Sequence, residues 1–167
     1  MPGATEDQTD ETLDQVQPND TVLAVSASGS PPFTLHAARI ATAAGAHVIG
    51  IANNPNTPLL QLADIPILLP TPPEILSGST RLGAGTAQKI ALNSLSTAMA
   101  VELGHVHDGM MINLRADNAK LRGRAEAIVS HIAAVDAATA RDALRQAGGE
   151  VKPATLIAAR TIPLPQA

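Results

Sequence analysis

Two short segments rich in hydroxyl side chains are the residues of this chain best suited to bind a ligand. The first is SASGS, Ser26–Ser30, and the second is SGSTR, Ser77–Arg81. Hydroxyls donate hydrogen bonds, glycine lets backbone N–H groups approach an anion, and arginine adds a charged donor. The candidate ligands of a phosphate or a sugar are therefore Ser26, Ser28, Ser30, Ser79, Thr80 and Arg81.

Each segment also has a purely structural interpretation. Ser26–Ser30 is compatible with an ordinary turn after a strand. In the second segment, Ser77, Ser79 or Thr80 is compatible with the N-cap of a following helix. Read singly, both segments favour the structural interpretation, whereas two such loops on one scaffold raise the odds of a phosphosugar site.

The elements around these loops predict an α/β fold with a parallel sheet. Apolar runs indicate strands at 21–26, 47–52 and 65–69, and helices at 33–44 and 84–103. Strands that alternate with helices over short links form parallel sheets. Ser26–Ser30 then lies at the carboxyl edge of the sheet, where α/β folds bind ligands.

The second half of the chain is predicted to be helical. Residues 84–103 are apolar on more than one face, which is typical of a buried helix. Asp117 is a predicted N-cap, and two short helices are expected on either side of Gly148–Gly149. We expect an acidic arm at 1–20, a main domain at 21–133 and a small helical appendage at 134–167.

Composition excludes several classes of function. The chain has no cysteine, which excludes disulfides. Its only aromatic residue is Phe33, which excludes aromatic stacking on bases. The net charge of −4 disfavours a nucleic-acid or anionic-membrane partner. No apolar run is long enough for a membrane span, and the acidic N-terminus is unlike a secretory signal, so we expect a cytoplasmic protein. The five scattered histidines predict no metal site.

Longer motifs carry a family resemblance. PEILSGSTRLGAGTAQK at 73–89, NAKLRGRA at 118–125 and ALRQAGGEVKPA at 143–154 together resemble the N-acetylmuramic acid 6-phosphate etherases. That family has the sugar isomerase (SIS) fold and is related to the glucokinase regulatory protein. The resemblance covers residues 3–160 and implies part of a three-layer SIS sandwich with a short parallel sheet, plus a small C-terminal helical appendage.

The resemblance also implies a reaction. Etherases of this family cleave the lactyl ether of N-acetylmuramic acid 6-phosphate by elimination and water addition, giving N-acetylglucosamine 6-phosphate and D-lactate. They use two glutamates and no metal or organic cofactor. GATEDQTDE, at 3–11, is similar to the segment that carries one of them, which would be Glu6. Glu74 and Arg81 would be polar anchors of the pocket wall.

Departures from the family pattern predict a weak catalyst. Ser30 stands where the family has arginine, Pro31 where it has threonine, and Gly83 where it has lysine. The family's N-terminal half, with the second glutamate and two strands, has no counterpart here. We expect a homodimer or association with such a half. The alternatives are a non-catalytic phosphosugar-binding or regulatory SIS module, or the product of a truncated gene.

Overall fold

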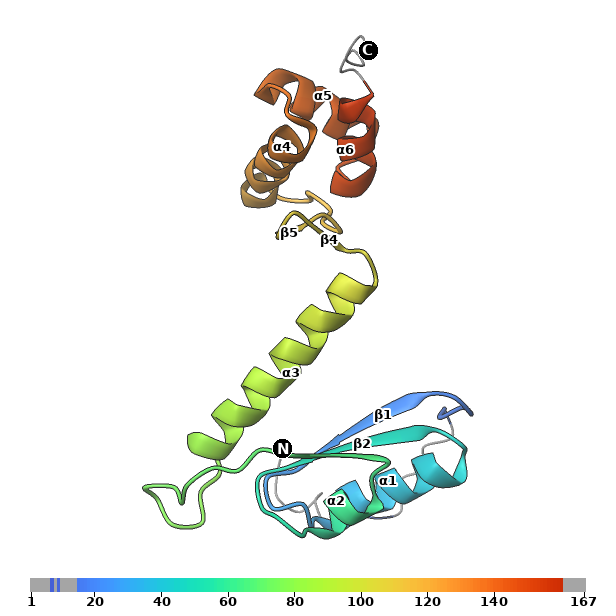
Figure 1. Ribbon diagram of the computed structural model, residues 1–167, viewed down its shortest axis with the longest axis vertical. Coiled ribbons are helices and arrows are strands. Elements are labelled where there is room, and N and C mark those ends of the chain that lie inside the picture. The colour runs from blue at the N-terminus through green and yellow to red at the C-terminus, as the bar shows by residue number, and fades with distance from the viewer. Residues whose placement is uncertain (1–6, 8, 10–14, 161–167) are drawn as a thin grey trace, which may run out of the picture. The chain divides into compact units, whose positions relative to one another are not determined.

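The computed structural model describes residues 7, 9 and 15–160, which contain six helices and five strands (Figure 1). The chain divides into two compact units, residues 1–94 and 95–167. The boundary falls inside helix α3 (Gly83–Glu102). Each unit has a hydrophobic core of its own, so each is described separately.

Unit 1 is built on a parallel sheet of three strands. They are β1 (Thr21–Val25), β2 (His47–Ala52) and β3 (Ile65–Leu68), in the order β1-β2-β3. In the register Leu23 lies beside Ile49, which lies beside Ile65. The predicted strands and their parallel pairing are confirmed.

Two helices cover one face of this sheet. They are α1 (Pro32–Ala43) and α2 (Pro58–Leu62), each with proline at its start, where the missing N–H needs no partner. Gly50 lets β2 lie close to the end of α2, because a Cβ at position 50 would lie 2.7 Å from the Cβ of Ala63. The buried cluster of this layer contains Ala24, Ala38, Ala41, Ala46, Val48 and Leu59.

The opposite face of the sheet is aliphatic. Side chains alternate between faces along a strand, and β1 and β2 contribute Ala24 and Val48 to the cluster under the helices. We call the other face the open face; it consists of Leu23, Val25, Ile49, Ile51, Ile65 and Ile67. α1 and α2 both lie on the side away from it (Figure 1).

Helix α3 has its predicted extent, but the prediction that it is buried is wrong. Ala84 is its only buried residue, and the side chains of Ile90 and Met99 are 61% and 54% exposed. The cores of both units are assembled from other elements. The apolar surface of α3 is therefore left largely exposed by the residues that the structure describes.

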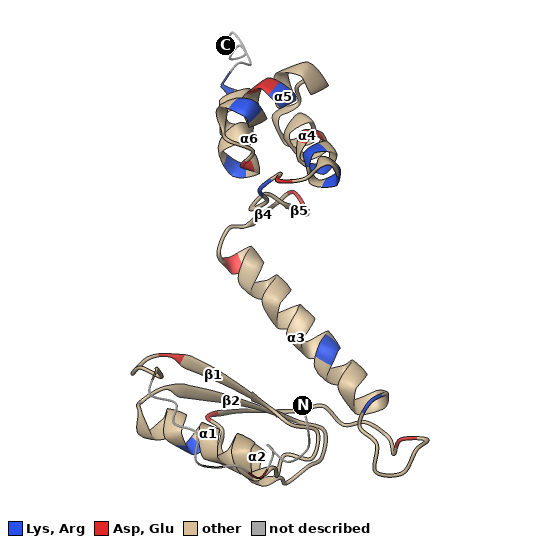
Figure 2. Ribbon diagram, turned by 180° about the vertical axis from the view of Figure 1, so that it is seen from behind, with Lys and Arg blue, Asp and Glu red and all other residues tan. Residues whose placement is uncertain are grey.

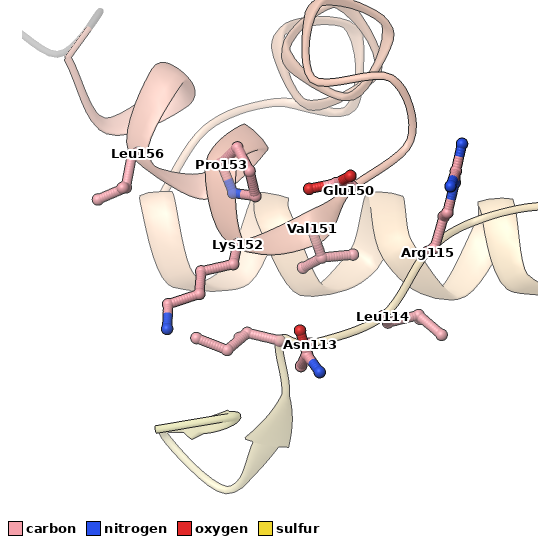
Figure 3. Close-up of a pocket in the computed structure, with 9 residues that line it drawn as sticks. Asn113, Leu114, Arg115, Glu150, Val151, Lys152, Pro153 and Leu156 are labelled. Carbon is pink, nitrogen blue, oxygen red and sulfur yellow. The ribbon is translucent and has the colours of Figure 1, made fainter. Parts of the chain in front are cut away.

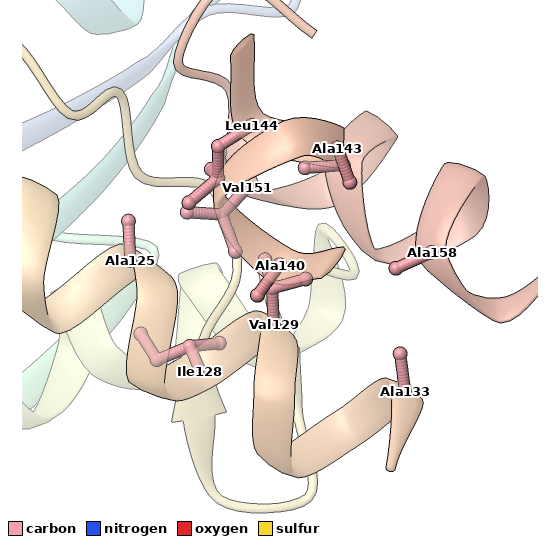
Figure 4. Packing of buried hydrophobic residues seen from close by; sticks show 10 residues of the cluster. Ala125, Ile128, Val129, Ala133, Ala140, Ala143, Leu144, Val151 and Ala158 are labelled. Carbon is pink, nitrogen blue, oxygen red and sulfur yellow. The ribbon is translucent and has the colours of Figure 1, made fainter. Parts of the chain in front are cut away.

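Unit 2 combines a small hairpin with three helices. The hairpin strands are β4 (Val106–His107) and β5 (Met110–Met111). The helices are α4 (Ala119–Ala133), α5 (Ala137–Gln146) and α6 (Val151–Ala159). Their shared core, shown in Figure 4, contains Ala125, Ile128, Val129, Ala133, Ala140, Ala143, Leu144, Val151, Ala154 and Ala158.

Two details of unit 2 concern the sequence predictions. The two short helices around Gly148–Gly149 are confirmed, and both glycines have positive φ, +62° and +86°. The predicted cap of α4 is wrong by one residue, because Asn118 Oδ1, not Asp117, accepts from Leu121 N at 2.9 Å. The structure groups α4 with α5 and α6, whereas the sequence placed a boundary after residue 133; the domain limits stay a prediction.

Within the described part of the chain, no helix has both the length and the apolar character needed to cross a bilayer.

Candidate functional site

A cavity of about 670 Å³ opens where the three parallel strands of unit 1 end. The loops after β1, β2 and β3 all contribute to it, because parallel strands bring their carboxyl ends to one edge of the sheet. We call it the sheet-edge cavity. It is lined by Ala27, Ser28, Asn53, Asn54, Thr71, Pro72, Pro73, Glu74, Ser77, Gly78, Ser79, Thr80 and Ala84.

The loop after β1 presents one serine to this cavity. Ser26 Oγ accepts a hydrogen bond from Gly29 N at 3.1 Å, so Ser26 shapes the turn. Ser30 Oγ donates to Ser28 Oγ at 3.2 Å, and Ser28, which is exposed, lines the cavity. Ser26 is thus bonded to the backbone of its own turn, Ser30 is bonded to Ser28, and Ser28 is the hydroxyl of the three that lines the cavity.

Gly29 sets the path of that loop. It has a φ of +67°, a backbone conformation that favours glycine. A Cβ at this position would overlap the Thr57 side chain, with Thr57 Cγ2 only 2.9 Å away. Leu59 N also donates to Gly29 O at 3.0 Å. The loop is thus fastened to the start of α2.

The loop after β3 supplies hydroxyls and the only ionisable side chain among the lining residues. Ser79 and Thr80 line the cavity, and Ser79 Oγ also accepts from Arg81 N at 3.3 Å. Glu74 Oε1 accepts from Ala84 N at 3.2 Å, so its carboxylate caps the first turn of α3. A carboxylate at a helix N-terminus is favoured by the unpaired N–H groups there.

A buried amide joins the three segments around the cavity. Asn53 is 5% exposed, and its Nδ2 donates to Leu69 O at 3.0 Å and to Ala84 O at 3.5 Å. Its Oδ1 accepts from Gln88 Nε2 at 2.8 Å. Asn53 therefore ties the ends of β2 and β3 to the beginning of α3.

The structure brings together some of the residues predicted from sequence. Ser28, Glu74, Ser79 and Thr80 line one cavity, while Ser26, Ser30 and Arg81 are absent from its lining. Arg81 has an exposed side chain, and Glu6 lies outside the described residues. Sequence reasoning missed Asn53, Asn54 and Thr71, although the two asparagines directly follow a predicted strand, and it named Ser77 only as part of the second hydroxyl-rich segment.

Unit 2 has a second cavity, of about 590 Å³, between the segment after the hairpin and the start of α6 (Figure 3). Arg115 and Glu150 belong to its lining and form an isolated antiparallel bridge through their backbones. Lys152, also in the lining, donates from Nζ to Gly104 O at 3.2 Å. This cavity has one amide and no hydroxyl side chain, so it is less suited to a sugar.

Histidines and acids do not gather into a metal site within residues 7, 9 and 15–160. His131 Nε2 lies 3.1 Å from Asp108 Oδ2, and both side chains are more than 60% exposed. An exposed pair of this kind contributes little to stability.

Comparison with known proteins bears on this geometry. The model of the SIS domain family matches residues 1–98, which is more than half of the chain. The chain belongs to the SIS domain family. The parallel sheet with helices and the cavity at its carboxyl edge form the part of the SIS domain described in unit 1.

Curated relatives of this SIS chain are named N-acetylmuramic acid 6-phosphate etherase. One from Deinococcus radiodurans is 53% identical over 142 residues, which is 85% of this chain and 47% of the relative. One from Rubrobacter xylanophilus is 45% identical over 82% of this chain, and one from Yersinia pestis is 41% identical over 92%. The chain spans about half the length of the curated relatives it matches.

Proposed function

We propose that the sheet-edge cavity binds a phosphorylated amino sugar of the kind named in its relatives, N-acetylmuramic acid 6-phosphate or its product. The observation that carries the proposal is the convergence of three loops rich in hydroxyl and amide groups on one cavity. Neutral donors suit sugar hydroxyls and phosphate oxygens alike. Ser28, Ser79 and Thr80 are the proposed ligands, and Ser26, Ser30, Glu74 and Arg81 support or flank them.

The proposal is tested by calorimetry with N-acetylglucosamine 6-phosphate. Combining Ser28→Ala with Ser79→Ala removes two lining hydroxyls and is expected to weaken binding roughly 10-fold, since each hydrogen bond contributes about 0.5–1.5 kcal/mol. The control combines Thr42→Ala with Ser94→Ala, which lie outside the cavity lining. Equal affinities in the two double variants would reject this site.

We propose that this chain alone has a low rate of ether cleavage. Ether elimination needs both a base and an acid within hydrogen-bond reach of the substrate. Among the residues that line the cavity, Glu74 is the only carboxylate, and it is bonded to Ala84 N. This arrangement favours the alternative function, a phosphosugar-binding or regulatory SIS module.

Turnover is measured as D-lactate released from N-acetylmuramic acid 6-phosphate by the purified chain. We expect a rate about 10²–10⁴-fold below that of the Deinococcus radiodurans relative, the usual cost of losing one member of an acid–base pair. A normal rate that Glu6→Gln abolishes would show instead that the chain is a complete etherase.

The proposed partners follow from the same assignment. A homodimer, or association with the part of the family that the chain does not match, would complete the pocket wall. A phosphorylated sugar is charged and crosses membranes poorly, so the proposed place of action is the cytoplasm, in the recycling of cell-wall amino sugars.

A further inference from the structure

The positive charge of this chain is concentrated in unit 2. The chain has a net charge of −4, but residues 95–167 hold eight of its eleven lysine and arginine residues (Figure 2). Five of the eight lie on α4 and α5. The local charge on these two helices is therefore opposite in sign to that of the chain as a whole.

Three of these arginines line one cavity of about 620 Å³. Arg122 comes from α4, Arg141 and Arg145 come from α5, and the lining contains one acid, Glu126. We call it the arginine cavity; it shares no lining residue with the sheet-edge cavity or with the cavity at the start of α6. Its volume lies in the range of small-molecule sites, about 300–1,000 Å³.

Ion pairs within the protein leave part of this positive charge unused. Arg141 Nη1 donates to Glu126 Oε1 at 2.8 Å, and Arg145 is paired with Asp142 on its own helix. Within residues 7, 9 and 15–160, Arg122 makes neither an ion pair nor a side-chain hydrogen bond. A guanidinium has five N–H donors, so Arg141 and Arg145 also keep donors for a ligand.

Helix stability does not explain why these arginines stand here. Arg122 is in the first turn of α4, where the helix dipole disfavours a cation, and that turn contains no acid. Arg141 and Arg145 are four residues apart on α5, a spacing at which like charges repel. An anion bound among the three guanidiniums would relieve both costs.

The rest of the lining leaves room for an organic group beside the charge. Leu144, which is 8% exposed, and Ala116 supply apolar surface. Gly148 and Gly149 form the turn after α5, and a Cβ at Gly148 would meet nothing within 4 Å. No side chain therefore narrows the cavity at this turn.

We propose that the arginine cavity binds a small molecule that carries a diphosphate group. Arg122 is the principal ligand, Arg141 and Arg145 add further donors, and Leu144 contacts the organic part. Guanidiniums bind phosphate through two parallel hydrogen bonds, so three of them are better matched by two linked phosphate groups than by one. This site goes beyond the proposed function and does not rest on it.

The test titrates inorganic diphosphate into the full chain and measures the affinity by calorimetry. Arg122→Glu should weaken binding roughly 10-fold or more, because it removes a charge-assisted hydrogen bond and adds a repulsion. The matched control is Arg124→Glu, which makes the same change of net charge at an exposed position of α4 outside the lining. This control should keep most of the affinity.

Further measurements locate the site and check the fold. In amide NMR spectra of the native chain, diphosphate should shift the signals of Gly148 and Gly149. Arg145→Gln, a second variant of the lining, should also weaken binding. Far-UV circular dichroism should be the same in the variants, because all three positions are exposed. Combining Ser28→Ala with Ser79→Ala alters the sheet-edge cavity and should leave the shifts of Gly148 and Gly149 unchanged.

Four outcomes would overturn the proposal. They are no binding of diphosphate, equal affinities for diphosphate and inorganic phosphate, equal weakening by Arg122→Glu and Arg124→Glu, and amide shifts at Gly78 of the sheet-edge cavity without shifts at Gly148. Equal weakening would show a response to net charge alone. Loss of sugar binding would sink the proposed function and leave the arginine cavity standing, and the reverse result would do the opposite.

Discussion

Asn53 shows how one buried side chain can organise the cavity that it also lines. Its amide satisfies Leu69 O and Gln88 Nε2, so the loops after β2 and β3 and the start of α3 are held at fixed distances. Removing a buried partner leaves the others unsatisfied, at a cost of about 1–3 kcal/mol. The position of the lining hydroxyls therefore depends on a residue that sequence analysis did not select.

Gly29 and Gly78 form a matched pair for testing the loops. Both have positive φ, but a Cβ at Gly78 meets nothing within 4 Å, whereas one at Gly29 overlaps Thr57. Gly78→Ala should cost about 1–2 kcal/mol from the backbone alone. Gly29→Ala should cost roughly 1–3 kcal/mol more, because the overlap must be relieved.

Urea unfolding followed by circular dichroism measures both glycine variants, since the chain has one phenylalanine and no tryptophan or tyrosine as a fluorescent probe. Adding Thr57→Ala to Gly29→Ala should recover most of the extra loss. Equal stabilities for the two single variants would contradict the close approach seen here.

At the residue scale, chain direction indicates which loops lie at the cavity. Ser28 is in the loop after β1, and the same rule would have selected Asn53 after β2. It could not foresee that Glu74 caps α3, because Glu74 lies ten residues before Ala84 and the intervening loop had to close first. Nor could it separate Ser28 from Ser26, whose hydroxyl is directed to Gly29 N.

At the scale of elements, the periodic segments were predictable and their surroundings were not. The limits of β1, β2 and α3 lie within one residue of the sequence predictions. The prediction that α3 is buried was wrong because an apolar pattern shows which residues a helix can bury, not which other elements cover them. The exposure of the open face of the sheet has the same cause.

The cap of α5 provides a pH-dependent test. Asp136 Oδ1 accepts from Thr139 N at 2.7 Å, and this backbone hydrogen bond, followed by one to the Thr139 side chain, lowers the pKa of Asp136 below its ordinary 3.8. Because the folded pKa is the lower one, the stabilisation is complete above the unfolded pKa and is lost as pH falls through the folded pKa. The window lies below about pH 4.

Asp136→Asn keeps a capping acceptor but cannot titrate. Thermal unfolding of this variant should lose part of the decrease in midpoint that the native chain shows between pH 5 and pH 2. Asp117→Asn is the matched control, because Asp117 caps no helix. Parallel pH profiles for Asp136→Asn and the native chain would show that the titration of Asp136 contributes nothing to the pH dependence.

At the scale of the whole molecule, the described residues form two cores that share no residue, one under the sheet and one among α4, α5 and α6. Separate cores unfold separately unless a large apolar interface couples them. We therefore predict two calorimetric transitions. Val48→Ala and Val129→Ala, both at fully buried positions, should each lower the midpoint temperature of one transition, because each costs its unit about 1–3 kcal/mol in free energy of unfolding.

A single transition lowered equally by both valine variants would show that the units unfold together. Ser94→Ala, at an exposed position on α3, is the control and should shift neither transition. Calorimetry is suited to this chain because it needs no chromophore.

The close packing of Gly29 against Thr57 constrains the order in which this protein can evolve. A first substitution at position 29 meets both the occupied space and the left-handed backbone, so selection removes it while threonine stays at 57. If position 57 first becomes smaller, only the backbone limits position 29, and asparagine, which tolerates that conformation, becomes accessible. Lineages in which glycine 29 has been replaced should therefore carry an earlier, smaller residue at 57.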